Sequence, residues 1–188
     1  MRRGDHHQPR DAVRPGVTTG ELDALAEQSI REQGGVPSFL GYGVPPFPAS
    51  ICASVNDEVV HGIPGSRVLA EGDVISIDCG AIVDGWHGDA AITVAVGEVA
   101  PEVTELMRVT EEAMWRGIAA ARLGGRVTDI SHAVESHVRS QGDFGILEDY
   151  VGQGIGSKMH QPPNVPNYGR PGRGPKLVRG LALAVEPM

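Results

Sequence analysis

VISIDCGAIVDGWHGDAAITVAVG, residues 74–97, is the stretch that decides the fold of this chain. Its two apolar, strand-like runs are joined by Asp84-Gly85, a dipeptide typical of a two-residue hairpin turn. Such a turn sets Asp78 opposite Ala91, and Asp89 lies two residues before Ala91 on the same strand. Both carboxylates are therefore predicted on one face of the hairpin as diagonal neighbours, an arrangement that suits a metal ion.

A structural role for Asp78 is the alternative. A carboxylate that ends a strand can accept backbone hydrogen bonds from the loop that follows it. A one-residue bulge in either strand would also place Asp89 on the opposite face from Asp78. The remainder of the sequence is needed to choose between these interpretations.

Composition and charge narrow the class of protein. A chain of 188 residues with 40% hydrophobic residues predicts one α/β or α+β unit. The 24 acidic residues outnumber the 16 basic ones, and no basic cluster interrupts them, which argues against a nucleic-acid partner. No apolar run reaches membrane-spanning length and the first residues lack a secretory signal, so we expect a cytoplasmic protein without a membrane partner. Cys52 and Cys79 are expected to be free thiols.

The first part of the chain combines an arm, a helix and a loop. Residues 1–16 are polar and interrupted by proline and glycine, and we expect a loose arm. An amphipathic helix begins after Thr18, which has capping-box spacing to Glu21, and ends at Gly34-Gly35. Residues 36–50 are rich in proline and glycine around three aromatic residues and predict a loop that can line a pocket.

The later elements follow from the same signals. A strand is predicted over residues 51–62, before the hairpin. Two helices are predicted after the hairpin, over roughly residues 101–123 and 128–140.

An internal repeat links the two ends of the chain. A shift of 108 residues aligns ELDALAEQSIREQG, residues 21–34, with DISHAVESHVRSQG, residues 129–142. The same shift aligns residues 72–80 with residues 180–188 and brings Asp78 onto Glu186. The helix match alone could arise by chance, but an unchanged offset at a second acidic residue favours two related halves that share a site.

Two histidines are candidate site residues. His61 ends the segment VNDEVVHGIPG just before a turn, where a single histidine is more often a packing or loop residue than a ligand. His160 follows the run VGQGIGSKM, whose glycines permit close approach of the backbone to a buried site.

Taken together, these motifs resemble the type I methionine aminopeptidases, a metallopeptidase family with the pita-bread fold. The resemblance runs from about residue 17 to residue 188 and includes LGYG, FPASICASVNDEVVHGIPG, IDCG, HGDAAIT, GIGSKMHQPPNVPNYG and VEPM. It implies an α+β fold of two pseudo-symmetric halves, with one domain over residues 17–188 and the last strands of the family missing.

The resemblance also implies a role for each matching residue. Asp78 is similar to the aspartate that binds one of two metals, Asp89 to the aspartate that bridges both, and Glu186 to the first of two glutamate ligands. His61 and His160 resemble the two catalytic, substrate-contacting histidines, and Glu186 would help to transfer the proton. The residues that correspond to the methionine side-chain pocket are Tyr42, Phe47, Cys52 and Met159.

This chain departs from the family pattern in two ways. Gln153 stands where the family has a metal-binding histidine, and an amide oxygen is a weaker ligand for transition metals than imidazole. The sequence also ends before the family's second bridging glutamate. Both departures predict weaker metal binding, with one ion or none in place of two, and reduced activity.

The implied activity is metal-dependent hydrolysis of the first peptide bond, which removes the N-terminal methionine of nascent proteins. The expected metals are manganese, cobalt or ferrous iron, and the expected partners are the N-termini of nascent polypeptides. The intact family implies a monomer, while the early end predicts association through an open strand edge. A non-catalytic module that binds peptide N-termini is the alternative, and a pita-bread enzyme that cleaves next to proline ranks third.

Overall fold

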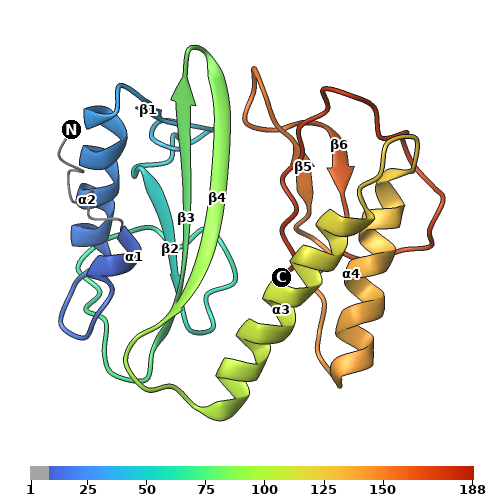
Figure 1. Ribbon diagram of the computed structural model, residues 1–188. Helices are drawn as coiled ribbons and strands as arrows, with labels where there is room; N and C mark the ends of the chain where they lie inside the picture. The colour runs from blue at the N-terminus through green and yellow to red at the C-terminus, as the bar shows by residue number, and fades with distance from the viewer. Residues whose placement is uncertain (1–8) are drawn as a thin grey trace, which may run out of the picture. The chain divides into compact units, whose positions relative to one another are not determined.

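The predicted hairpin is the centre of the first half of the chain. In the computed structural model, which describes residues 9–188, the hairpin consists of β3 (Val74–Val83) and β4 (Trp86–Ala95) (Figure 1). The chain divides into two compact units, Met1–Pro101 and Glu102–Met188, which we call the first and second unit. Both units combine helices with strands, so the α+β class is confirmed.

The turn and the register of the hairpin are as predicted. Asp84 and Gly85 have φ angles of 51° and 80°, the left-handed backbone that a type I′ turn requires at both positions. Asp78 is paired with Ala91, and the register of the two strands is continuous. Because side chains alternate along a strand, Asp78 and Asp89 project from the same face of the sheet.

Two short strands complete this sheet. β1 (Val36–Pro37) and β2 (Ile51–Val55) both pair antiparallel with β3. Because β4 occupies one edge of β3 along its whole length, β1 and β2 share the other edge. β3 is therefore the central strand, and the residues on it have neighbours on both sides.

The apolar core of the first unit lies on the face of the sheet opposite the two aspartates. Helix α2 (Thr19–Glu32) covers this face (Figure 1). Leu22 and Ala26 of α2 are buried against Ile75 and Ile77 of β3. The sheet thus separates an apolar face under α2 from a polar face that carries the acidic pair.

Local hydrogen bonds fix the N-terminal part of α2 to its surroundings. The Thr18 hydroxyl accepts from the Glu21 amide at 3.1 Å, and the Glu21 carboxylate accepts from the Thr18 amide at 2.8 Å, so the predicted capping box is present. The Asp23 carboxylate accepts the amides of Ser50 and Ile51 at 2.8 and 3.0 Å. The helix therefore positions the start of β2.

Two expectations for the first unit need correction. β2 ends at Val55, well before residue 62, because Asn56 adopts a left-handed φ of 59° and its side chain bonds Asp73 and the amide of Val74. Residues 9–16 of the expected loose arm include helix α1 (Pro9–Ala12), and Ala12 and Val13 pack against the core, so this part is fixed. Residues 1–8 of the expected arm lie outside the described residues.

The second unit contains two packed helices. α3 (Pro101–Ala120) and α4 (Val127–Gln141) match the two predicted helices closely. Val109 and Ala113 of α3 bury against Val134 of α4. At Gly117 a Cβ atom would lie only 2.8 Å from Cγ2 of Val134, so glycine is what permits the close approach.

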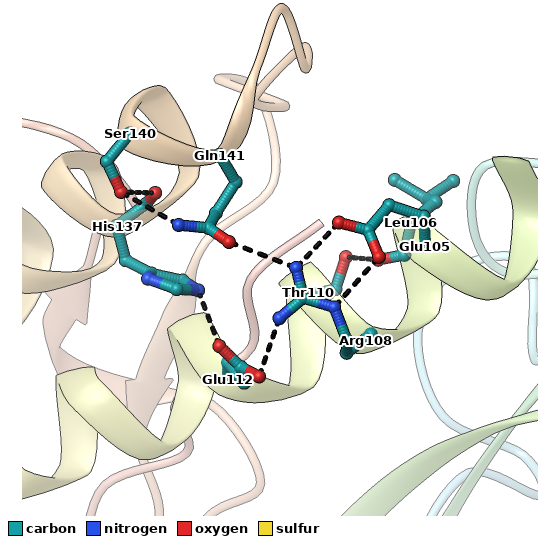
Figure 2. A network of polar contacts seen from close by, with 8 residues as sticks. All are labelled: Glu105, Leu106, Arg108, Thr110, Glu112, His137, Ser140 and Gln141. Atoms are coloured by element: carbon teal, nitrogen blue, oxygen red, sulfur yellow. Dashed lines mark hydrogen bonds and ion pairs between the residues drawn. The ribbon is translucent and has the colours of Figure 1, made fainter.

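A polar network joins the outer faces of α3 and α4 (Figure 2). The Arg108 guanidinium donates to Glu105, to Glu112 and to the side-chain oxygen of Gln141 on α4. Nε2 of His137, a buried residue of α4, lies 3.3 Å from Glu112. Arg108 and both glutamates are partly exposed, so we expect these ion pairs to add less stability than the apolar contacts beneath them.

The rest of the second unit is a short hairpin and an irregular final segment. β5 (Gly152–Gly154) and β6 (Gln161–Val165) pair antiparallel with an irregularity after Gln153. Residues 180–188, which the repeat aligns with residues 72–80, form no strand but make one isolated bridge, between Gly154 and Leu183. The backbone oxygen of Gln153 also accepts the amide of Ala184 at 2.8 Å.

The backbone hydrogen bonds of the two units support the predicted repeat. α2 and α4 begin 108 residues apart. Five further interactions recur with both residue numbers raised by 108. One is the bridge Thr18–Val68, which recurs as Arg126–Lys176. The other four are hydrogen bonds from a backbone amide to a backbone oxygen: Gly16 to Leu69 recurs as Gly124 to Leu177, Leu69 to Val17 as Leu177 to Gly125, Thr19 to Arg67 as Val127 to Pro175, and Gly20 to Gly65 as Thr128 to Arg173.

In the middle of each copy, the residue numbers of the two units differ by 99 instead of 108. The strand pair Val55–Ile75 corresponds to the bridge Gly154–Leu183, in which the first residue is shifted by 99 and the second by 108. His61 and His160 are also 99 residues apart. Between the start of its helix and its histidine, the second unit is thus nine residues shorter than the first. Between the histidine and the next matching bonded residue, Gly65 in the first unit and Arg173 in the second, it is nine residues longer.

Within residues 9–188, no helix combines the length and the hydropathy that crossing a membrane requires.

Candidate metal centre and substrate site

The polar face of the first unit holds Asp78 and Asp89 as neighbours. Asp78 is half-buried on the central strand, flanked by Cys52 on β2 and Ala91 on β4. Burial first, and then the negative charge of Asp89, raise the pKa of the Asp78 carboxyl to about 7. The two carboxylates are therefore close enough to repel each other in the metal-free protein.

The donor chemistry of this pair fits a divalent cation. Two half-buried carboxylates that repel each other are stabilised in their charged form by a nearby cation, and carboxylate oxygen is a ligand for manganese, cobalt and ferrous iron. Neither unit, over the described residues, contains a group of three or more His, Cys, Asp or Glu side chains placed to hold a metal. The described part of the first unit, from residue 9 onward, therefore supplies two protein ligands at most, and a complete site needs others.

Cys52 and Cys79 are free thiols, as predicted. Burial raises the pKa of Cys52 to about 12 and that of Cys79 to about 11, and the charge of Asp78 adds to both shifts. Both thiols therefore stay protonated at neutral pH and are unsuited to bind a metal as thiolates. Cys52 lies on the polar face beside Asp78, where its small side chain can contact a ligand.

The predicted loop over residues 36–50 contains β1 and a chain of turns. Its tip closes on itself because the amide of Gly41 bonds the oxygen of Phe47 at 2.8 Å, and the amide of Phe47 bonds the oxygen of Tyr42 at 2.8 Å. The Tyr42 side chain is exposed and the Phe47 side chain is half-buried. Two of the predicted pocket residues are thus held on one closed turn.

His61 is exposed at the start of a segment that packs tightly on β2. The Ala53 amide donates to the oxygen of Gly62 at 2.8 Å, and the Gly62 amide donates to the Ser54 hydroxyl at 3.0 Å. Further along, the Gly65 amide donates to the Thr19 hydroxyl at 2.9 Å. The backbone beside His61 is therefore fixed at several points by β2 and α2.

The remaining candidates lie in the second unit. Gln153 and Met159 are buried, His160 is exposed, and Glu186 is half-buried near the end of the chain. The bond between Ala184 and Gln153 brings the segment that carries Glu186 beside β5. The predicted site residues thus form one set around Asp78 in the first unit and a second set around β5 in the second unit.

Two polar residues near the candidates were not predicted from the sequence. The Ser38 hydroxyl lies 3.0 Å from Nδ1 of His87, which shares a face of β4 with Asp89. Asn167 is buried and donates through Nδ2 to the backbone oxygen of Glu186 at 2.8 Å. The sequence could have placed His87 on the same face as Asp89, because the two residues are two positions apart on one predicted strand. No local pattern in the sequence marks Asn167.

Comparison with known proteins identifies the family. The model of metallopeptidase family M24 matches residues 6–188. A methionine aminopeptidase from Clostridium acetobutylicum is 57% identical over 178 residues, which cover 94% of this chain and 70% of that relative. The chain belongs to metallopeptidase family M24. As a member of the family it is a metal-dependent exopeptidase, a hydrolase with the pita-bread fold.

Relatives and solved structures favour the methionine-specific branch of family M24. Methionine aminopeptidase 1 of Mycobacterium tuberculosis is 52% identical over 95% of this chain and 69% of its own length. The crystal structure of methionine aminopeptidase from Thermotoga maritima matches with a TM-score of 0.91 and 41% identity, over 95% of this chain and 71% of that chain. An X-Pro aminopeptidase from the same organism matches with a TM-score of 0.77 and 25% identity. Proline-directed and non-catalytic alternatives are therefore not favoured.

Proposed function

We propose that this protein removes the N-terminal methionine from nascent polypeptides by hydrolysing their first peptide bond. The observation that carries the proposal is the 57% identity to a methionine aminopeptidase, together with the half-buried acidic pair Asp78 and Asp89 on one face of the sheet. Such a protein would act in the cytoplasm, where nascent chains emerge.

Asp78, Asp89 and Glu186 would hold the divalent metal, with the side-chain oxygen of Gln153 as a weaker fourth ligand. Manganese, cobalt and ferrous iron suit this set of oxygen donors. When bound, the metal supplies a Lewis acid that polarises the scissile carbonyl and lowers the pKa of the attacking water. Glu186 would accept a proton from that water and return it to the leaving amine.

Two histidines would handle the peptide itself. His160 would donate a hydrogen bond to the carbonyl oxygen as negative charge develops there, and His61 would bond the peptide amide. The segment next to His61 is held against β2, which supports a fixed position for its imidazole.

The methionine side chain would lie against apolar and soft side chains. In the first unit Cys52 is buried and Phe47 is half-buried on the closed turn, and in the second unit Met159 is buried, so each unit would contribute apolar surface to the pocket. Tyr42 would close the pocket from its exposed position. Selectivity for methionine would come from shape and apolar contact.

The test is release of methionine from a Met-Ala-Ser peptide by purified protein that has been stripped of metal and reloaded with Co²⁺, Mn²⁺ or Fe²⁺. A bound metal stabilises the transition state by several kcal/mol. Asp89→Asn should weaken metal binding and therefore lower kcat/KM about 100-fold or more. Asp84→Asn, the same substitution in the turn of the same hairpin, is the matched control and should retain activity.

Absence of methionine release with all three metals would contradict the proposal. Equal loss of activity in the Asp84 and Asp89 variants would show that hairpin stability, rather than a metal ligand, had been measured.

A further inference from the structure

The side chain of Asn167 makes a direct contact with the residue that carries a proposed metal ligand. Asn167 follows β6 in the segment PNVPNYG and is only 1% exposed. Its Nδ2 atom donates to the backbone oxygen of Glu186 at 2.8 Å. The two residues are 19 positions apart, so the bond joins separate parts of the second unit.

The segment around Glu186 depends on such contacts because it is not a regular strand. On one side, the amide of Ala184 bonds the oxygen of Gln153 at 2.8 Å. On the other side, the oxygen of Met188 accepts the amide of Leu147 at 2.9 Å. Asn167 anchors Glu186 itself, between these two points.

The loop that presents Asn167 is in turn held by α4. The Gly169 amide donates to the Glu135 carboxylate at 2.9 Å, and the Gly172 amide donates to the Asp129 carboxylate at 2.7 Å. The Thr128 hydroxyl both donates to the oxygen of Arg173 and accepts its amide. The position of Asn167 is therefore set by one face of a helix.

Stability alone does not explain an asparagine at this position. A backbone oxygen requires a donor, so Nδ2 must face Glu186 and Oδ1 must face away. Oδ1 is buried and has no hydrogen-bond partner among the residues that the structure describes. A buried polar atom without a partner lowers stability, and an apolar side chain of similar shape avoids that cost.

We propose that Asn167 is a positioning residue that fixes Glu186 for metal binding. This inference rests on the proposed role of Glu186 as a metal ligand. The Nδ2 bond restricts the backbone at Glu186, which limits the region that its carboxylate can occupy. Groups that orient metal ligands in this way typically change metal affinity 10- to 100-fold when they are removed.

The decisive comparison is between Asn167→Leu and Thr128→Val, both of which keep side-chain shape. Thr128→Val removes two hydrogen bonds from the same loop at its far end. Co²⁺ binding by titration calorimetry and thermal melting of the metal-free protein should be measured for both variants. Asn167→Leu should weaken Co²⁺ binding about tenfold or more with an unchanged or higher melting midpoint, whereas Thr128→Val should lower the midpoint and keep the affinity.

Unchanged Co²⁺ affinity in Asn167→Leu would overturn the proposal, and so would an equal loss of affinity in Thr128→Val. If Asn167→Leu fails to fold, Asn167→Ala, which removes the donor without adding charge, must show the loss of affinity instead. If the unaltered protein binds no Co²⁺, the proposed function fails separately. Hydrogen exchange at the amides of Val185, Glu186 and Met188 in metal-free protein then decides, because Asn167→Leu must accelerate that exchange and unchanged rates refute the inference.

Discussion

At the scale of single residues, Gly62 shows how closely the segment after His61 approaches β2. A Cβ atom at position 62 would overlap the carbonyl oxygen of Ala53, which is backbone and cannot move away cheaply. At Gly65, three residues later, no atom lies within 4 Å of the place where a Cβ would stand. Close packing against β2 therefore requires glycine at position 62, whereas position 65 has room for a larger side chain.

Gly62→Ala should lower the free energy of unfolding by about 1–3 kcal/mol, because the added methyl forces the segment off β2. Gly65→Ala is the matched control and should stay within about 0.5 kcal/mol of the unaltered protein. Urea denaturation of the metal-free variants measures both values. Equal stability of the two variants would contradict the packing that we describe.

Gln153 is the residue at which this chain differs from the family pattern within the proposed ligand set. It is buried on β5, and its backbone is fixed by Ala184 and by pairing with Asn164. Replacement by histidine would place a stronger transition-metal ligand at a position that is already rigid.

Gln153→His should tighten Co²⁺ binding by about tenfold, which corresponds to about 1.4 kcal/mol. Gln153→Leu should weaken binding, since it removes the amide oxygen. Titration calorimetry with Co²⁺ measures both changes. If Gln153→His and Gln153→Leu bind Co²⁺ equally well, position 153 is not a metal ligand.

At the scale of elements, the two equivalent helices begin with different chemistry. α2 uses the hydroxyl of Thr18 together with Glu21, whereas α4 has Arg126 at the same position and depends on Asp129. The Asp129 carboxylate accepts the amides of Arg126 and Gly172, both at 2.7 Å. These two backbone hydrogen bonds hold the pKa of Asp129 below its ordinary value of 3.8.

Asp129→Asn should destabilise the protein at neutral pH, because a neutral amide accepts the two backbone bonds less strongly than a carboxylate. A lowered folded-state pKa gives stability that is present above the ordinary value and is lost as pH falls through the lowered one. The difference in melting midpoint between the two proteins should therefore shrink below about pH 4. Asp143→Asn, at an exposed position, is the control, and a pH-independent difference for Asp129→Asn would contradict the assignment.

At the scale of the whole molecule, a bound metal should stabilise the fold. The Asp89 charge opposes ionisation of Asp78 in the metal-free protein, and a cation removes that repulsion. A ligand at a hundredfold excess over its Kd adds about 2.7 kcal/mol to the free energy of unfolding.

Saturating Co²⁺ or Mn²⁺ should therefore raise the melting midpoint, and a chelator should reverse the change. Asp89→Asn should melt at the same temperature with and without metal. Differential scanning calorimetry measures these shifts, and a metal-induced shift of full size in Asp89→Asn would exclude Asp89 as a ligand.

Signals between near neighbours were readable from the sequence. The Asp84-Gly85 turn determined the pairing of Asp78 with Ala91, and the spacing of Thr18 and Glu21 determined the start of α2. The end of β2 was not readable, because Asn56 turns the chain through bonds to Asp73, 17 residues away.

Other contacts between residues far apart in the sequence were also not predicted, because they too depend on the folded chain and not on a local pattern. Ser38 and His87 are 49 positions apart, and Asn167 and Glu186 are 19 apart, so no periodicity or turn signal encodes either pair. The repeat was the exception, because one offset of 108 recurs in the backbone bonds of both units. Comparing two copies made some long-range pairings visible where local patterns could not.

The two copies have the same overall span, but the second copy has nine residues more after its histidine and nine fewer before it. The nine surplus residues fall between His160 and Arg173, where the first copy runs directly from His61 to Gly65. Asn167 lies in that surplus, so the first copy has no aligned counterpart of the residue that anchors Glu186. The two related acids are therefore held by different means, Asp78 by strands paired on both sides and Glu186 by a side-chain hydrogen bond to its backbone.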